Sequence, residues 1–146
     1  SDQAVKTMNG FMLFNTSRGE VKPLDGFLYI TAMAREDWAK ANEQTAARFL
    51  RAIQAALIAI GDPAQTNKAR DAVRKAFHSN TDEAFYATLW ESNAPAFPKS
   101  IALDAKMIAR VVDFVNEFDP QPLDKGAIDG GWSNHYAERA LKPSSD

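Results

Sequence analysis

The chain has 146 residues, 45% hydrophobic and 25% charged, and its 17 basic and 19 acidic side chains give a formal net charge of −2. These proportions are typical of one ordinary folded domain and exclude a disordered, collagen-like or disulfide-stapled chain. The chain has no basic surplus and no cysteine. We therefore expect no nucleic-acid partner, and thiol catalysis and cysteine-ligated zinc are excluded.

The longest near-apolar run, Ala55–Ile60, is far shorter than the roughly 20 residues that span a bilayer, so we expect no transmembrane helix. The chain opens on Ser-Asp-Gln, with no Met and no apolar signal core. This opening is typical of a processed product, a tag-cleaved product or a piece of a longer protein.

Two apolar, aromatic-rich runs in the first third predict short strands. Phe11–Phe14 follows the turn pair Asn9-Gly10, and Phe27–Met33 also follows turn chemistry. The polar stretch Asn15–Gly26 between them is longer than a tight hairpin requires. Long irregular connections are often functional or cross between lobes, so we expect this loop to lie near a ligand or a lobe boundary.

From Ala34 onward the apolar residues recur with helical spacing. Asn42 is expected to divide a short helix from a longer one that Gly61 ends. The further helices are expected from Pro63 to His78, from Thr81 through Trp90 to a stop before Pro95, from Asp104 to Phe118, and from Gly130 to Leu141.

The predicted fold class is mainly α with two short strands. We expect a single domain or fragment over residues 1–146, with a strand-loop-strand crossover in residues 1–33 and the helical portion of a lobe in residues 34–141. Two short strands are too few to make a sheet that about five helices could cover. The pattern therefore predicts an incomplete fold.

Signals for catalysis and for metal binding are weak. His78 and His135 lack a second histidine at helical metal-site spacing, although Asp82 lies four residues after His78. No serine has a nucleophile-elbow context, the acidic pairs lie at predicted helix starts, and the glycine pairs form no phosphate-cradling fingerprint. We expect no enzyme, no cofactor and no metal site.

The tryptophans and tyrosines recur at helical spacing, which favours a place in the core over a ligand pocket. Tyr29–Thr31 is the exception, because a strand that leaves a long polar loop is where a cleft between lobes would place ligand contacts.

The order of these pieces resembles a known family. The order begins with an apolar strand after Gly10 and a variable loop. These are followed by the run Phe27–Trp38, the run Lys40–Pro63, and closing segments at Ala102–Phe118 and Ala127–Leu141. This order is similar to the C-terminal half of the nitrate/sulfonate/taurine-type substrate-binding proteins of ABC importers, a group that includes binding proteins for the pyrimidine precursor of thiamine. The motif positions that match are Arg35, Trp38, Ala41–Glu43, Phe49–Ala52 and Asp62-Pro63.

The resemblance implies an incomplete part of an α/β periplasmic-binding-protein-like (type II) fold, because members of the family are bilobal and longer than this chain. It implies the solute-binding component of a bacterial ABC importer, which clamps a small polar or anionic solute by lobe closure. The implied partners are that solute and the membrane permease subunits of the importer. The implied location is the periplasm, or an extracytoplasmic lipid anchor.

The resemblance also implies a set of ligand contacts. Asn15 and Thr16 end the first expected strand, and Tyr29 and Thr31 lie on the second. Arg18, in the loop, is the best local cation for an anionic head group.

The helical faces that begin at Ala46 and Met107 are wide enough to need partners, so we expect the isolated chain to form a homodimer.

Two other readings of the function stay open. A stand-alone helical protein-interaction module would share the same packing rules. An enzyme on the same scaffold, as in the thiamine-pyrimidine branch, would need a nucleophile or cofactor lysine that the sequence does not indicate.

Overall fold

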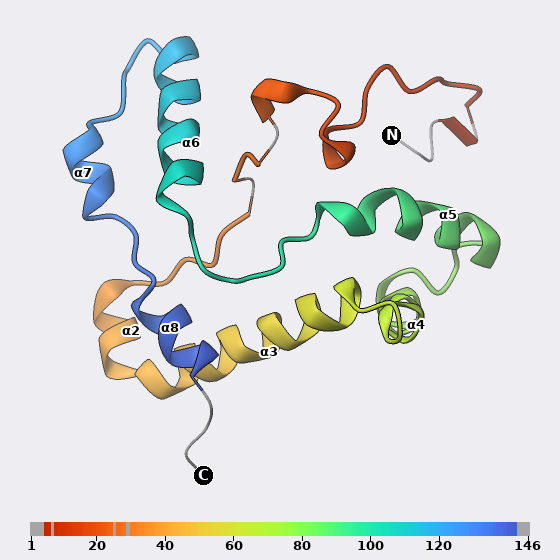
Figure 1. Cartoon of the computed structure of the whole chain (residues 1–146), viewed down its shortest axis with the longest axis horizontal. Coiled ribbons are helices and arrows are strands. Elements are labelled where there is room, and N and C mark those ends of the chain that lie inside the picture. The colour runs from red at the N-terminus through yellow and green to blue at the C-terminus, as the bar shows by residue number, and fades with distance from the viewer. Residues whose placement is uncertain (1–4, 7, 25, 29, 143–146) are drawn as a thin grey trace. The chain divides into compact units, whose positions relative to one another are not determined.

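The computed structural model describes residues 5–6, 8–24, 26–28 and 30–142, with all their side chains except those of residues 17, 125 and 127. Within these ranges the regular structure is entirely helical (Figure 1). The α-helices are α2 (Glu36–Ala41), α3 (Glu43–Gly61), α4 (Thr66–Phe77), α5 (Glu83–Asn93), α6 (Ala105–Phe118), α7 (Lys125–Asp129) and α8 (His135–Leu141). The 3₁₀ helices are η1 (Thr16–Arg18), η2 (Lys22–Leu24) and η3 (Ala94–Ala96).

The prediction of two strands is wrong for the described residues. Phe11–Phe14 and the described part of Phe27–Met33 have no strand structure. A strand needs a neighbour to pair its backbone N–H and C=O groups, and the described chain provides none for either run. As a result Phe11 is 81% exposed and Met33 is 91% exposed.

The expected part of an α/β periplasmic-binding-protein-like fold is therefore also wrong, because the described residues contain no sheet for helices to cover. The aromatic and β-branched residues of both runs favoured strands, but that preference measures how well side chains pack on an existing sheet. Without a sheet to pack against, these side chains gain nothing from an extended backbone. The regular structure of the described residues is therefore helical.

The expected helix boundaries are confirmed where a local signal sets them. The break at Asn42 separates α2 from α3, and α3 ends at Gly61. Asp82 caps α5 by accepting a hydrogen bond from Phe85 N at 2.9 Å. Asp104 caps α6 by accepting one from Lys106 N at 2.8 Å.

Two boundaries differ from the expectation. Asp62 accepts hydrogen bonds from Ala64 N at 2.8 Å and from Gln65 Nε2 at 2.6 Å, which closes a turn before α4 begins at Thr66 rather than at Pro63. The expected helix from Gly130 begins instead at His135, and α7 was not expected at all. Asp124 caps α7 through Gly126 N at 2.9 Å.

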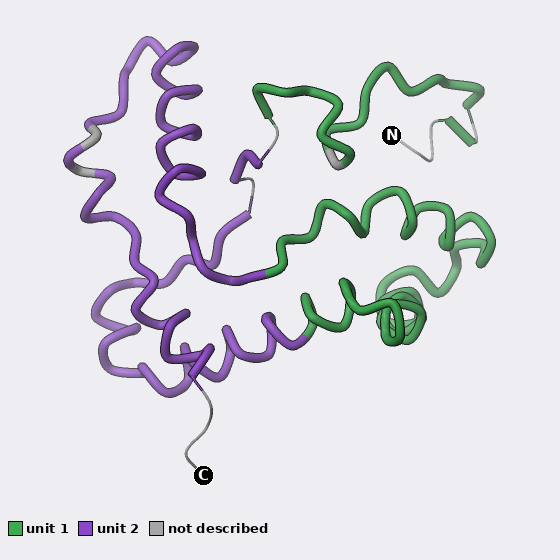
Figure 2. Tube along the Cα trace, viewed as in Figure 1, with its two compact units in different colours: residues 1–25, 56–99 green, residues 26–55, 100–146 purple. Residues whose placement is uncertain are grey.

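The chain divides into two compact units (Figure 2), each described by itself. Unit 1 consists of residues 1–25 and 56–99 and holds the N-terminal segment, the end of α3, α4 and α5. Within it, α4 joins α5 through a hydrogen bond of 3.0 Å from Trp90 Nε1 to Thr66 Oγ1. His78 also lies against Tyr86, with ring centroids 5.3 Å apart.

Unit 2 consists of residues 26–55 and 100–146, among them α2, most of α3, α6, α7 and α8. Arg51 Nε donates to Ala140 O at 3.2 Å, which ties α3 to α8. Asn134 holds both backbone groups of Leu103, accepting from its N–H and donating to its C=O, each at 2.8 Å.

Small side chains dominate the core of the described residues. The buried apolar residues are Ala39, Ala47, Tyr86, Val112, Ala137 and Ala140. Tyr86, at 6% exposed, meets the expectation of a core aromatic, whereas Trp38 is 46% exposed. Burial raises the pKa of the Tyr86 phenol, because an apolar environment disfavours its ionised form.

Among the described residues, every helix is too short or too polar to cross a bilayer.

Candidate functional site

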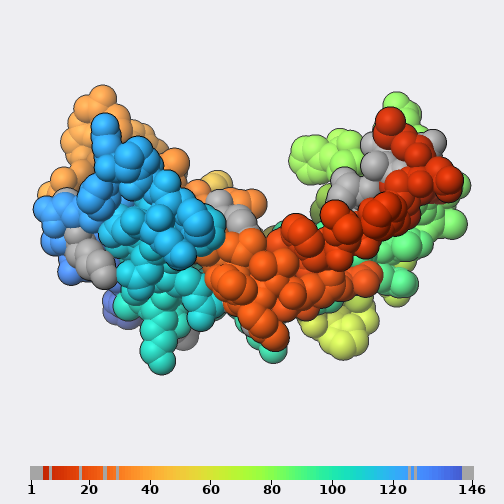
Figure 3. All heavy atoms as spheres, turned by 90° about the horizontal axis from the view of Figure 1, so that it is seen from above, coloured from red at the N-terminus to blue at the C-terminus, as the bar shows by residue number. Residues whose placement is uncertain are grey.

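Unit 1 contains an open groove between the N-terminal segment and α5. Its volume of about 550 Å³ falls in the range that small-molecule sites occupy. In the space-filling view the red N-terminal segment lies against the green atoms of α5 (Figure 3). The groove is lined by Val5, Lys6, Met12, Asn15, Arg18, Asp82, Ala84, Phe85, Thr88, Leu89 and Ser92.

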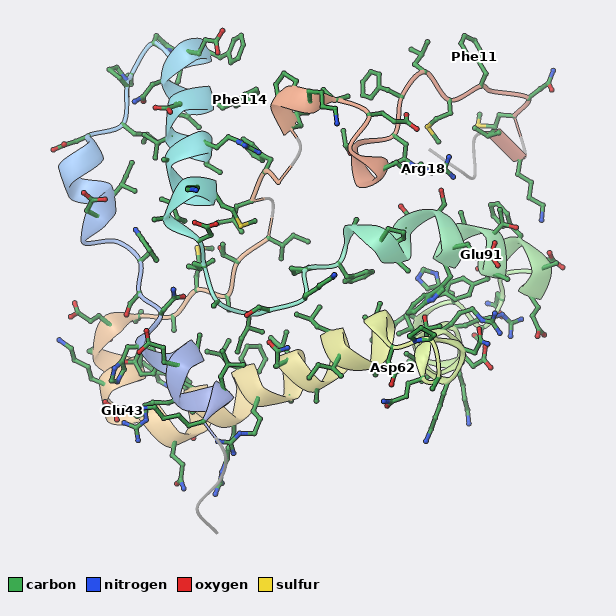
Figure 4. All side chains as sticks on the ribbon, in the orientation of Figure 1. Phe11, Arg18, Glu43, Asp62, Glu91 and Phe114 are labelled. Carbon is green, nitrogen blue, oxygen red and sulfur yellow. The ribbon has the colours of Figure 1, made fainter. Side chains whose placement is uncertain are left out.

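At the C-terminal end of α5, two donors converge on one hydroxyl group. Arg18 Nη2 donates to Ser92 Oγ at 2.9 Å, and Asn15 Nδ2 donates to the same oxygen at 3.5 Å. Ser92 is only 9% exposed, whereas the Arg18 side chain is exposed and extends toward α5 (Figure 4). A guanidinium group carries five N–H donors, and the bond to Ser92 uses one of them.

Local backbone geometry sets the position of Arg18. Arg18 N donates to Asn15 O at 3.1 Å, which closes the single turn of η1. Gly19 follows with a φ of 67°, a left-handed conformation that glycine adopts without steric cost. This tight turn brings the side chains of Asn15 and Arg18 to the same point on α5.

A second charged group lies at the N-terminal end of α5. Lys6 Nζ is 3.3 Å from Asp82 Oδ1 and 4.1 Å from the centroid of the Phe85 ring. Asp82 and Ser92 are ten positions apart, which corresponds to about 15 Å along a helix axis. The groove therefore has a cation near each end of α5.

The charges on the groove favour an anion. Among its described lining residues, Lys6 and Arg18 are cationic and Asp82 is anionic. The Phe85 N–H and then Lys6 lower the pKa of the Asp82 carboxyl, because both favour its charged form. Met12, Phe85 and Leu89 add apolar walls to the groove.

The arrangement is suited to noncovalent binding. At the Ser92 end, Arg18 and Asn15 donate hydrogen bonds to Ser92 Oγ, and no histidine is among the described lining residues to act as a base for Ser92. Across the described residues, no group of three or more His, Cys, Asp or Glu side chains could hold a metal ion.

The ligand contacts expected from the sequence have different outcomes. Asn15 and Arg18 come together at the groove. Thr16 begins η1 and is exposed, but it is not a lining residue. Thr31 belongs to unit 2 and is exposed, and Tyr29 lies outside the described residues.

Sequence analysis missed three residues of this site. Lys6 carried no motif, Ser92 lies inside a helix with no distinctive context, and Asp82 was explained as a helix cap, which it also is. The only sequence signal for these three residues was the helix cap at Asp82, which marks where α5 begins.

The two histidines do not belong to the groove. His78 directly follows α4 and packs on Tyr86, and His135 Nε2 is 3.7 Å from Glu43 Oε1. Glu43 also pairs with Arg139 Nη1, so this carboxylate joins α3 to α8 in unit 2.

No protein-family model, no curated protein and no solved structure matches the chain.

Proposed function

We propose that this chain binds a small anionic solute in the groove along α5, as the solute-binding component of a bacterial ABC importer. The observation that carries the binding proposal is the convergence of Arg18 and Asn15 on the buried Ser92 at the edge of a groove of about 550 Å³. The importer role, the permease partner and the extracytoplasmic location rest on the resemblance of the sequence to the nitrate/sulfonate/taurine-type binding proteins.

Arg18 is the main anchor in this proposal. The planar fork of a guanidinium group matches the oxygens of a carboxylate or sulfonate, and the bond to Ser92 orients that fork. Lys6 lies near the other end of α5, where it already faces Asp82. One small head group therefore binds at Arg18, because Asp82 already neutralises most of the charge of Lys6.

The apolar walls of the groove add a second criterion. Met12, Phe85 and Leu89 would cover the body of a solute whose head group meets Arg18. Burying one methylene group contributes roughly 0.8 kcal/mol. The best solutes are therefore anions that carry a short apolar chain, rather than bare inorganic ions.

Isothermal titration calorimetry with nitrate, methanesulfonate and butanesulfonate tests this proposal. We expect butanesulfonate to bind most tightly and R18A to weaken its binding roughly ten- to hundredfold, the effect of one charge-assisted hydrogen bond. The matched control is R48A, which removes an exposed arginine of unit 2. Absence of binding by the wild type, or equal losses in R18A and R48A, would contradict the proposal.

A second candidate function, a helical protein-interaction module, is favoured by exposed apolar side chains of the N-terminal segment. Met8, Phe11 and Leu13 are 78%, 81% and 80% exposed, and Phe11 points away from α5 (Figure 4). Exposed large apolar side chains that gather in one segment are a common mark of a protein-interaction site. The occupant we propose is a second copy of this chain, which would bury the same residues in both copies.

A further inference from the structure

The turn pair Asn9-Gly10 takes no part in the groove, since neither residue is among its described lining residues. The pair lies in the N-terminal segment of unit 1, outside the helices of the described chain. Both residues are exposed, and so are Met8 and Phe11 on either side of them. Within the described ranges, no hydrogen bond or ion pair involves Asn9 or Gly10. Water therefore reaches the Asn9 side chain and the backbone beside it.

The backbone at this pair allows the Asn9 side chain to approach the next nitrogen. Asn9 has a φ of 53°, a left-handed conformation that costs energy for residues other than glycine, although asparagine tolerates it better than most. Gly10 has no Cβ, so other atoms can come close to its backbone nitrogen. Exposed segments with few contacts change conformation at low cost. Asn9 Cγ and the Gly10 nitrogen can therefore meet.

This meeting places a nucleophile beside an electrophilic carbon. The Gly10 nitrogen becomes nucleophilic when a base in the solvent takes its proton, and the amide carbon Cγ of Asn9 accepts its electron pair. A bond forms between Gly10 N and Asn9 Cγ, and the bond from Cγ to Nδ2 breaks. Nδ2 takes up a proton and leaves as ammonia. The product is a cyclic imide that joins the Asn9 side chain to the Gly10 nitrogen.

Water then opens the imide in one of two ways. Addition at Cγ breaks the new bond to Gly10 N and leaves an aspartate. Addition at the backbone carbonyl carbon of Asn9 breaks the original peptide bond and leaves an isoaspartate, in which the chain runs through the side chain. In both cases one amide and one water become one carboxylate and one ammonium ion. The product carries one more negative charge than the formal −2 of the chain.

The other seven asparagines have surroundings that oppose the same reaction. Asn80 is followed by Thr81, whose N–H donates to His78 O at 2.9 Å. The other six are each followed by a residue of an α-helix or a 3₁₀ helix, where the helical backbone fixes the nitrogen that would attack. These six are Asn15, Asn42, Asn67, Asn93, Asn116 and Asn134. None of the seven precedes a glycine, so the sequence and the structure both single out Asn9.

We propose that Asn9-Gly10 is a site of spontaneous deamidation, at which water converts Asn9 to a mixture of aspartate and isoaspartate through a cyclic imide. The turn pair is then a chemical modification site that needs no enzyme. The proposal goes beyond the solute-binding function and does not depend on what the groove binds.

Incubation of the full chain in ¹⁸O-labelled water at mildly alkaline pH, followed by digestion in ordinary water and mass spectrometry of the peptides, measures the reaction at each asparagine. We expect Asn9 to take up ¹⁸O several-fold faster than each of the other seven. The rate is expected to rise with pH, because a base must take the Gly10 proton. Equal rates at all eight asparagines would overturn the site.

The product mixture tests the cyclic imide. A protease that cuts only before aspartate is expected to cleave part of the labelled Asn9 product and to leave the isoaspartate part uncut. Complete cleavage of the labelled product would show direct hydrolysis of the side-chain amide and would overturn the attack by the Gly10 nitrogen.

Two variants separate the glycine from its surroundings. Gly10 does not have a positive φ, so alanine fits the same backbone. G10A adds a methyl group beside the attacking nitrogen and is expected to slow the reaction at Asn9 several-fold. T81G places a glycine after Asn80, where the N–H donates to His78 O, and Asn80 is expected to remain slower than Asn9. An unchanged Asn9 rate in G10A would overturn the role of Gly10. Equal rates at Asn80 and Asn9 in T81G would overturn the role of the surroundings.

Discussion

Arg18 Nη2 donates a hydrogen bond of 2.9 Å to Ser92 Oγ, although the two residues are 74 positions apart in the chain. Asn15 Nδ2 reaches the same oxygen. The buried hydroxyl at the end of α5 therefore fixes the η1 turn, and with it the side chain that we propose as the anion anchor.

We expect S92A to destabilise the protein by about 1 kcal/mol, because the substitution removes the oxygen that accepts from Arg18 and Asn15. Urea denaturation measures this loss. The matched control is S79A, which truncates an exposed serine of the same unit and is expected to change stability by a few tenths of a kcal/mol at most. Equal midpoints for S92A and S79A would show that the contact contributes nothing.

Asp82 is expected to make stability depend on pH in the acid range. Its pKa is lowered in the folded protein by the Phe85 N–H and by Lys6, so the ionised form stabilises the fold. This contribution is fully present above the ordinary aspartate pKa of about 3.9 and is lost as the pH falls through the lower folded value. Urea midpoints between about pH 5 and pH 2 are expected to fall less steeply in D82N than in the wild type.

The D82N variant also separates capping from charge. Asparagine caps a helix nearly as well as aspartate, so D82N is expected to keep more stability at neutral pH than D82A. Some acid dependence is expected to remain in both, because the pKa values of Asp37 and Asp62 are lowered as well. Identical acid profiles for D82N and wild type would contradict the assignment to Asp82.

Asn134 is expected to be among the most sensitive polar positions of unit 2. Its side chain satisfies the N–H and the C=O of Leu103, so N134A leaves two partly buried backbone groups without their partner. A loss of about 1–3 kcal/mol is expected in urea denaturation. N80A, which truncates an exposed asparagine, is the control and is expected to have little effect. A loss in N134A no larger than that in N80A would refute the role of this bridge.

The exposed N-terminal segment predicts self-association. Light scattering at increasing concentration is expected to show a dimer for the wild type and a monomer for F11S/L13S. The variant F77S/L141S, which removes two exposed apolar side chains outside the segment, is expected to remain dimeric. A wild type that stays monomeric at high concentration would rule out the second copy as the occupant.

Helix boundaries could be predicted from the sequence because their causes are local. Asp82 and Asp104 accept hydrogen bonds from backbone N–H groups two or three residues further on, so a short window contains the whole interaction. The five-residue α7 was missed because its polar surroundings show no helical recurrence of apolar residues, although Asp124 caps it in the same way.

The prediction of two strands failed because a strand is not a local structure. Phe11–Phe14 has the composition of a strand, but only a paired neighbour would give its backbone hydrogen bonds. The candidate site could be only partly predicted from the sequence for the same reason. Arg18 was recognisable as the cation of a polar loop, whereas its partner Ser92 is defined by a contact across 74 positions.

Helix α3 belongs to both compact units, since the division falls between residues 55 and 56 and the helix continues to Gly61. Helix formation is cooperative, so unwinding that begins at one end of α3 weakens the turns beside it. Heat or denaturant that melts one unit therefore also withdraws support from the other. We expect the chain to unfold in one calorimetric transition rather than two.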